Sequence, residues 1–214
     1  MESMQQQIKT LQKIVSRKRT SKALTFSIPH VLKSILLLSK QKYVSRTTFC
    51  DELHIGEGAV RTLISHLKEY EFADSIKAGT FLTIRGRNFA KKFQEAMPYQ
   101  SFLKKCCLTN GKHNCAIILR KDHVTGIGNG MQQRDYAILY GASDSLTLRF
   151  KKEEFVFVGD EVVCFADEPE IKNNLIETLH PRNKDIVIIT SSDDKFVAEI
   201  SAINTALWTL GTQK

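Results

Sequence analysis

The segment from Ser45 to Ile84 constrains the fold most, because it predicts four consecutive elements in a recognisable order. A helix is expected to begin at Ser45, a residue that caps exposed backbone N–H groups, and to end at Ile55-Gly56, where glycine permits a tight turn. Two short strands are expected over residues 73–77 and 80–84. A second helix is expected between the first helix and these strands, since apolar residues recur there at helical spacing: Val60, Leu63, Ile64, Leu67 and Tyr70. Helix, turn, helix and hairpin is the element order of a winged helix-turn-helix domain.

The outward face of the second helix predicts contacts with DNA. Arginine binds guanine in a bidentate manner, and serine and threonine bind base edges or phosphates. The open first turn of a helix accepts phosphate. With this helix in the major groove and the hairpin on the backbone or minor groove, we expect the interface to contain Ser45, Arg46, Thr47, Glu57, Gly58, Arg61, Thr62, Ser65, His66, Lys68, Lys77, Gly79 and Thr80. The alternative is a solvated helix face on a winged helix that binds only proteins.

The positive charge of the chain is concentrated in the half that contains this segment. Residues 1–97 hold 17 lysines and arginines against 8 acidic residues, whereas residues 98–214 hold 14 against 15. The net charge of +8 therefore lies wholly in the N-terminal half. A basic domain joined to a near-neutral one favours a nucleic-acid-binding module coupled to a module with another kind of partner.

Three segments flank the predicted winged helix. Residues 1–22 are polar and basic, and we expect either an amphipathic helix followed by a basic arm, Arg17-Lys18-Arg19 with Lys22, or a frayed tail. Ile28-Pro29 is expected to start the first helix of the domain, because proline is tolerated in a first turn. After the hairpin, a helix is expected over residues 88–97. These boundaries predict a DNA-binding domain over residues 23–97 and a linker over residues 98–112, which includes a short helix near residues 102–108.

Residues 113–214 show a mixed pattern of strands and helices. Strands are expected over residues 115–120 and 185–190, a hairpin over 146–158, and helices over 131–140, 169–179 and 196–210. Strands that alternate with helices predict one mixed sheet with helices packed on it. The expected fold class is therefore α+β overall, with an N-terminal winged helix-turn-helix and a C-terminal α/β domain.

A glycine loop lies between the first of these strands and the helix that follows. Glycines let backbone N–H groups approach an anion closely, and a helix start adds a favourable dipole. The loop fits neither the dinucleotide fingerprint nor the P-loop. We expect it to bind a small anionic ligand through Gly126, Gly128, Asn129, Gly130, Gln132, Gln133, Arg134 and Asp135. The structural alternative is a tight connection between a strand and a helix.

No catalytic residue, metal site or cofactor is predicted. The histidines are scattered, and no serine or cysteine lies in a nucleophile motif. Cys106, Cys107, His113 and Cys115 contain no CxxC pair, so buried apolar thiols are a better interpretation than zinc ligands. Two acidic pairs each precede a predicted helix, where they are expected to act as caps: Asp167-Glu168 and Asp193-Asp194.

The composition predicts a cytoplasmic protein. No apolar run approaches the roughly 20 residues needed to cross a bilayer. The first residues lack the apolar core of a secretion signal. Five cysteines, an odd number without a regular framework, fit a reducing compartment.

Three stretches resemble a family of archaeal winged-helix transcription regulators with an uncharacterised C-terminal α/β domain: IGEGAVRTLISHLKE, LTIRGRNFAKKF and TGIGNGMQQRDYAILYGAS. The first two look like winged-helix regulators in general, and the third is more specific. The resemblance extends over most of residues 28–210. It implies a transcription regulator, but it implies neither a ligand nor a catalytic residue.

We therefore predict a regulator that binds double-stranded DNA, with a C-terminal domain for ligand sensing, dimerisation or both. A homodimer is expected, with apolar seams at Ile8/Leu11/Val15 and at residues 196–210. One alternative is an enzyme whose nucleotide- or phosphate-binding C-terminal domain is fused to a DNA-binding module. The other is an adaptor whose winged helix binds protein, for which a near-neutral N-terminal half is expected.

Overall fold

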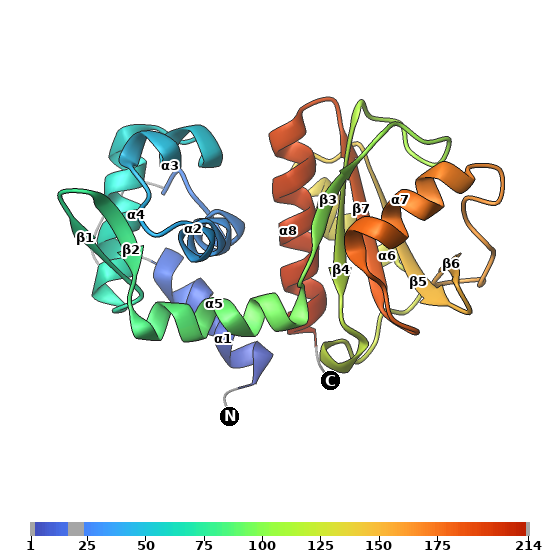
Figure 1. The fold of residues 1–214 in the computed structure, drawn as a ribbon, viewed down its shortest axis with the longest axis horizontal. Helices are drawn as coiled ribbons and strands as arrows, with labels where there is room; N and C mark the ends of the chain where they lie inside the picture. The colour runs from blue at the N-terminus through green and yellow to red at the C-terminus, as the bar shows by residue number, and fades with distance from the viewer. Residues whose placement is uncertain (1–2, 17–23, 213–214) are drawn as a thin grey trace. The chain divides into compact units, whose positions relative to one another are not determined.

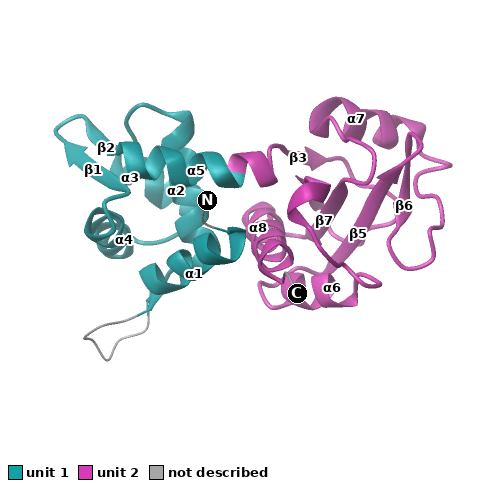
Figure 2. Cartoon of the chain, turned by 90° about the horizontal axis from the view of Figure 1, so that it is seen from below, with its two compact units in different colours: residues 1–93 teal, residues 94–214 magenta. Residues whose placement is uncertain are grey.

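The computed structural model describes residues 3–16 and 24–212, and the chain divides into two compact units, residues 1–93 and 94–214 (Figures 1 and 2). Unit 1 contains α1 (Met4–Val15), α2 (Ile28–Lys40), α3 (Arg46–Leu53), α4 (Glu57–Glu69), β1 (Ala73–Ile76), β2 (Gly79–Leu82) and most of α5 (Ile84–Ala96). Unit 2 contains β3 (Gln100–Leu103), β4 (His113–Leu119), the short 3-10 helix η1 (Lys121–His123), α6 (Met131–Ile138), β5 (Asp144–Lys151), β6 (Glu154–Phe157), α7 (Pro169–Leu179), β7 (Ile186–Ser192) and α8 (Lys195–Gly211).

Helices α3 and α4 form the predicted helix-turn-helix. Ser45 caps α3, because its hydroxyl oxygen accepts the backbone N–H of Thr48 at 3.0 Å. Helix α4 buries the predicted apolar face and leaves its opposite face exposed. The turn between the helices differs from the prediction: His54 takes the left-handed conformation, with φ 51°, whereas Gly56 is extended and begins α4. The expectation that glycine makes this turn was therefore wrong.

The N-terminal segment is helical and packs within the chain. Helix α1 contacts α2, and its Ile8, Leu11 and Ile14 side chains are buried. The first apolar seam predicted for a dimer is therefore used inside unit 1, which corrects that prediction. The predicted basic arm, Arg17-Lys18-Arg19 with Lys22, lies outside the described residues.

The wing is an antiparallel hairpin held to the start of α3. Strands β1 and β2 pair from Ala73 opposite Leu82 to Ile76 opposite Gly79. Val44 adds a third partner, because its N–H and carbonyl each bond to the backbone of Thr80 at 2.9 Å. Gly79 has φ 136°, and a Cβ there would lie 2.8 Å from the carbonyl oxygen of Val44. The wing therefore requires glycine at this position.

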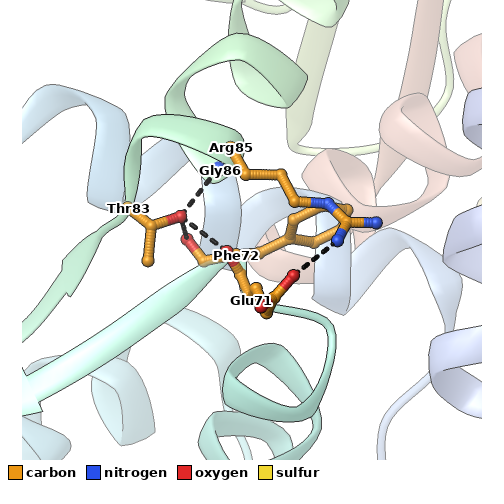
Figure 3. A network of polar contacts seen from close by, with 5 residues as sticks. All are labelled: Glu71, Phe72, Thr83, Arg85 and Gly86. Atoms are coloured by element: carbon orange, nitrogen blue, oxygen red, sulfur yellow. Dashed lines mark hydrogen bonds and ion pairs between the residues drawn. The ribbon is translucent and has the colours of Figure 1, made fainter.

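The end of the wing leads directly into α5 (Figure 3). Thr83 caps this helix, since its hydroxyl accepts the N–H of Gly86 at 3.0 Å and donates to the carbonyl of Glu71 at 2.6 Å. A Cβ on Gly86 would lie only 1.9 Å from the carbonyl oxygen of Phe72, so no larger residue fits. Arg85 reaches back to the Glu71 carboxylate at 2.8 Å. The helix thus begins at Ile84, four residues before its predicted start.

Unit 2 is built on one five-stranded sheet with the order β3-β4-β7-β5-β6. The prediction of one sheet with packed helices is confirmed, but the mixed sheet was wrong, because every pair of neighbouring described strands is antiparallel. Strands β4 and β5, which follow each other through α6, are not neighbours in the sheet. Strand β7 lies between them and runs antiparallel to both. The alternation of strands and helices could not reveal this insertion.

Part of the predicted linker belongs to the sheet. Residues 100–103 form edge strand β3, which pairs with β4, so the short helix expected near this point is absent from the described segment. Leu103 joins the core of unit 2. The following loop is tied to α7, because the Glu168 carboxylate accepts the N–H of Cys107 at 3.1 Å and its Sγ–H at 2.9 Å. Glu168 therefore holds a loop and does not cap its helix as predicted, whereas Asp194 does cap α8.

The two faces of the sheet are covered by different helices (Figure 1). On one face, α7 packs Leu175 and Leu179 against Ile118, Ile189 and neighbouring strand residues. On the other face, α8 contacts β4 and β7, and α6 contacts β5 and α8. The Ile200, Ile203 and Leu207 side chains of α8 are buried. The second apolar seam predicted for a dimer is therefore also used inside the chain.

Candidate functional site

A groove of about 350 Å³ in unit 1 brings together three segments of the predicted DNA interface. It is lined by residues 44–46 before and within α3, by α4, and by the wing from Ser75 to Thr80. Three cations lie along it: Arg46 on α3, Arg61 on α4, and Lys77 in the turn between β1 and β2. The fold of unit 1 therefore brings three positive charges together along one groove beside Arg61 and Ile64 of α4.

Glu57 holds two of these cations in place. Its carboxylate accepts a hydrogen bond from Arg61 at 2.7 Å and lies 3.6 Å from Arg46. The hydrogen bond and charge of Arg61, followed by the charge of Arg46, lower the pKa of the Glu57 carboxyl, so it is ionised at neutral pH. All three side chains are exposed, so these ion pairs are weak and can be exchanged for other anions.

Most of the other predicted contacts lie on the exposed surface. Thr62 is half-buried, and its hydroxyl donates to the carbonyl of Gly58 at 3.0 Å. Lys68 forms an ion pair with Asp74 of the wing at 3.1 Å, which links α4 to β1. The residues with exposed positions are Ser45, Arg46, Thr47, Glu57, Gly58, Arg61, Ser65, Lys68 and Lys77.

Three residues of the predicted interface take part in tertiary contacts within unit 1. The Nδ1 atom of His66 lies 2.7 Å from the carbonyl oxygen of Ile14, and its ring packs edge-on against Phe26. Thr80 is 3% exposed, and its hydroxyl lies 3.1 Å from that of Ser75. Gly79 allows the wing to approach the backbone of Val44 closely, because it has no side chain. Helical spacing and residue type alone did not reveal these tertiary contacts.

The glycine loop of unit 2 is explained largely by its own backbone. Gly128 and Gly130 have φ 60° and 87°, conformations that favour glycine. Gly130 begins α6, and the side-chain oxygen of Asn129 accepts the N–H of Met131 at 3.2 Å. A Cβ on Gly130 would lie 3.2 Å from Val158. These observations support the structural explanation of a tight connection for Gly128 and Gly130.

The predicted ligand residues of this loop point to different places. Gln133 is 1% exposed, so its side chain lies inside unit 2, and its Oε1 atom has no hydrogen-bond partner among the described residues. Gln132, Arg134 and Asp135 are exposed on α6. Gly126 lines a second groove, which also contains basic side chains that the sequence reasoning missed: Lys121, Arg149, Lys151 and Lys184.

Within residues 3–16 and 24–212, no group of three or more His, Cys, Asp or Glu side chains is arranged to hold a metal ion. The cysteines in question differ in exposure, since Cys106 and Cys115 are buried and Cys107 is exposed. No helix in the same described ranges is long and apolar enough to cross a membrane.

Comparisons with known proteins find similarity to a domain and to a solved structure that have no assigned function. Residues 110–210 match the model of a domain described as a domain of unknown function, DUF4443. The solved structure of the hypothetical protein PH0730 from Pyrococcus horikoshii OT3 is similar, with a TM-score of 0.71 and 25% identity, covering 86% of this chain and 92% of that chain. No curated protein matches.

A MarR family protein from Mycobacterium tuberculosis is a further structural match, with a TM-score of 0.30 and 18% identity, covering 42% of this chain and 60% of that chain. That similarity is too low to support an argument about function. The coarser part of the expected resemblance is confirmed: the chain is similar to an archaeal protein, and its C-terminal part matches the model of a domain of unknown function.

Proposed function

We propose that this chain is a transcription regulator whose unit 1 binds double-stranded DNA. Helix α4 enters the major groove, and the β1–β2 wing lies along the sugar–phosphate backbone. One observation carries the proposal: Arg46, Arg61 and Lys77 come from three segments and line one groove beside α4. The chain acts by binding, and we assign it no catalytic step.

Two further properties support this proposal. The excess positive charge of the chain lies in residues 1–97, which is the electrostatic pattern of a nucleic-acid-binding domain. The ion pairs that hold Arg61 and Arg46 to Glu57 are exposed, so DNA phosphates or base edges can replace the carboxylate without exposing a buried charge. Arg61 then serves base recognition, and Lys77 on the wing serves backbone attachment.

The test is a selection of duplexes bound by the full chain from a random pool, followed by fluorescence anisotropy on the selected duplex. Arg61→Ala is expected to weaken specific binding by about 1–3 kcal/mol and to relax the preference at one base pair. Lys77→Ala is expected to weaken binding to all duplexes alike. It should also lower the magnitude of the slope of log binding constant against log salt concentration by about one. Lys9→Ala, an exposed lysine on α1 outside the groove, is the matched control.

Salt-independent binding, or no binding of any duplex, would falsify the proposal. Equal losses for Arg61→Ala and Lys9→Ala would leave only non-specific attraction by net charge, and would also contradict the assigned interface.

We also propose that the chain acts as a homodimer, because regulators of this architecture commonly read two half-sites related by two-fold symmetry. The two apolar seams expected from the sequence are buried in the described chain, so the dimer contact must use other surfaces. Light scattering at micromolar concentration tests the assembly directly, and a monomeric mass would contradict it.

A further inference from the structure

Unit 2 contains a groove of about 660 Å³ that the proposed DNA-binding function does not use. Four separate segments line it: residues 121–127 after β4, the end of β5, the turn after β6, and the residues that begin β7. Its size lies within the roughly 300–1,000 Å³ range of small-molecule sites.

The charges along this groove are predominantly positive. Lys121, Arg149, Lys151 and Lys184 line it, and the carboxylates among the lining residues are Asp122 and Glu161. Unit 2 as a whole has no such excess, because residues 94–214 hold 14 basic against 16 acidic residues. The cations are therefore concentrated locally, as they are in sites that bind anions.

The register of the sheet explains why these residues meet. Ile186, at the start of β7, lies opposite Leu119 at the end of β4 and opposite Arg149 near the end of β5. Arg149 and Ile186 thus belong to the sheet face that carries α6 and α8, since Thr190 on the same face of β7 bonds to Ala198 of α8. Lys121 and Lys184 adjoin the same end of the sheet.

A buried ion pair fixes the backbone that carries Lys121 and Lys184. Asp185 is 1% exposed, and it accepts hydrogen bonds from the Arg120 guanidinium at 2.5 Å and from the N–H of Lys121 at 3.0 Å. It also accepts the N–H of Arg182 at 2.9 Å. Lys121 and Lys184 each adjoin one member of this pair, so their backbone is held rigidly before any ligand binds.

Glu161 acts as a counter-ion within the groove. Its carboxylate lies 2.7 Å from Lys151 Nζ and 3.4 Å from the Arg149 guanidinium. The hydrogen bond and charge of Lys151, then the charge of Arg149, lower the pKa of this carboxyl. Glu161 itself has φ 58°, a conformation uncommon for a residue with a side chain. It is exposed, so a stronger anion can replace it.

We propose that this groove binds a small phosphorylated ligand. The phosphate replaces the Glu161 carboxylate between Arg149 and Lys151, because a guanidinium and an ammonium form charge-assisted hydrogen bonds with phosphate oxygens. Lys121 and Lys184 neutralise the remaining charge. The rest of the ligand lies against the apolar part of the lining, Val124, Ile127 and Ile186.

The shape and composition of the groove favour a small molecule over a nucleic-acid backbone. An apolar wall beside a cationic cluster is the usual composition of a small-ligand pocket, whereas a backbone track is positive along its length. The Asp122 carboxylate also interrupts the positive lining, which disfavours an extended polyanion. A phosphate probe and a duplex probe therefore distinguish the two sources of the same chemical group.

The experiment measures thermal shift and calorimetric binding for the full chain with inorganic phosphate, pyrophosphate, AMP and a mixed-sequence duplex, all at one ionic strength set with KCl. We expect at least one small phosphate probe to raise the unfolding temperature and to bind in the range of about 10 μM to 1 mM. Arg149→Ala and Lys184→Ala should each weaken that binding by about tenfold. Lys105→Ala, which removes an exposed lysine outside the groove, should not change it.

Glu161→Gln makes the test sharper, because it removes the competing charge and keeps a side chain of the same size. We expect it to tighten binding of the same probe several-fold. The inference is overturned if no phosphate probe stabilises the wild type beyond KCl, if Lys105→Ala loses as much affinity as Lys184→Ala, or if only the duplex binds through these residues. The DNA-binding test uses Arg61 and Lys77, so either proposal can fail without the other.

Discussion

The two grooves of this protein share one arrangement of charges but build it in different ways. In unit 1, Glu57 lies between Arg61 at 2.7 Å and Arg46 at 3.6 Å. In unit 2, Glu161 lies between Lys151 at 2.7 Å and Arg149 at 3.4 Å. Glu57 and Arg61 are one helical turn apart on α4, whereas Glu161 reaches its partners from a turn in the left-handed conformation. The first site is thus largely local, and the second depends on the tertiary fold.

The interactions that hold the two grooves in shape also differ. The wing of unit 1 is held by backbone hydrogen bonds and by glycines at points of close approach, Gly79 and Gly86. The groove of unit 2 adjoins a buried ion pair, Arg120–Asp185. A buried charge that loses its partner is costly, whereas a lost surface pair changes stability little. The comparison therefore predicts which substitutions damage folding and which alter binding alone.

The largest effect is expected from Asp185→Ala. This change leaves Arg120 buried without its counter-ion and removes the acceptor of two backbone N–H groups, so unit 2 should lose about 3–5 kcal/mol of unfolding free energy. Trp208, the only tryptophan, lies in unit 2 and reports its unfolding in urea by fluorescence. The double variant Arg120→Met/Asp185→Leu should recover much of the loss, because it removes both charges together.

A urea midpoint for Asp185→Ala within error of the wild type would show that the pair does not support unit 2. It would contradict the conclusion that the groove of unit 2 depends on a buried ion pair, whereas the groove of unit 1 depends on backbone contacts.

The next largest effect is expected from Gly86→Ala in unit 1. The added methyl group would lie 1.9 Å from the carbonyl oxygen of Phe72, so β1 and α5 must move apart (Figure 3). We expect a loss of about 2 kcal/mol or more, measured by hydrogen exchange of the α5 and β1 amides. Gly58→Ala is the matched control, because a Cβ there meets nothing within 4 Å and alanine favours the helix. Equal protection in both variants would contradict the close approach.

The contrast between local and tertiary organisation also explains what the sequence could predict. The spacing of Val60, Leu63 and Leu67 was sufficient to locate α4, because a helix repeats within one segment. The start of α5 was misplaced, since it depends on Thr83 contacting Glu71 twelve residues earlier. The direction of β7 was also not predictable, because strand order is set by pairings between distant segments.

The candidate sites follow the same rule. Arg61 could be assigned to an outward helix face from periodicity, whereas His66 on the same helix turned out to bond the carbonyl of Ile14, 52 residues away. In the basic groove of unit 2, the glycine-loop pattern pointed only to Gly126, because Lys121, Arg149 and Lys184 come from three segments that only the sheet register brings together.

A smaller effect, on the pH dependence of folding stability, is expected to differ between the two units. Burial, and then the charge of Lys33, lowers the pKa of His30 to about 4 from an ordinary value of 6.5. The unfolded chain therefore binds a proton more readily between these values, and the stability that neutral His30 contributes is present above pH 6.5 and lost as the pH falls toward 4. Its Nδ1 atom accepts the N–H of Ser27 at 3.3 Å, a bond that protonation removes.

We expect unit 1 to lose about 1–2 kcal/mol over this window. His30→Gln should remove that dependence, because a glutamine oxygen accepts the same N–H without titrating. The groove of unit 2 should keep its ion pairs through this window, since the pKa of Glu161 is lowered below its usual 4.5. Hydrogen exchange of α2 amides at pH 6.5 and 4.5, in the wild type and in His30→Gln, measures the difference. Identical pH profiles for the two proteins would exclude His30 as the cause.

The smallest effect is expected from replacing each of the two glutamates, Glu57 and Glu161, with glutamine. Glu57→Gln frees Arg46 and Arg61 and removes a negative charge beside the expected path of the DNA backbone, so affinity for the selected duplex should rise by about three- to tenfold at moderate salt. The gain should shrink as salt increases, because it comes from exposed charges. Glu161→Gln changes the net charge of the chain equally, yet it should leave duplex affinity unchanged and act on phosphate binding in unit 2. If both variants raise duplex affinity alike, net charge alone is responsible, and the assignment of DNA to one groove and a small phosphate to the other is wrong. If Glu57→Gln instead weakens binding at one base pair only, the carboxylate reads a cytosine amino group, and Glu57 is a recognition residue, not a counter-ion.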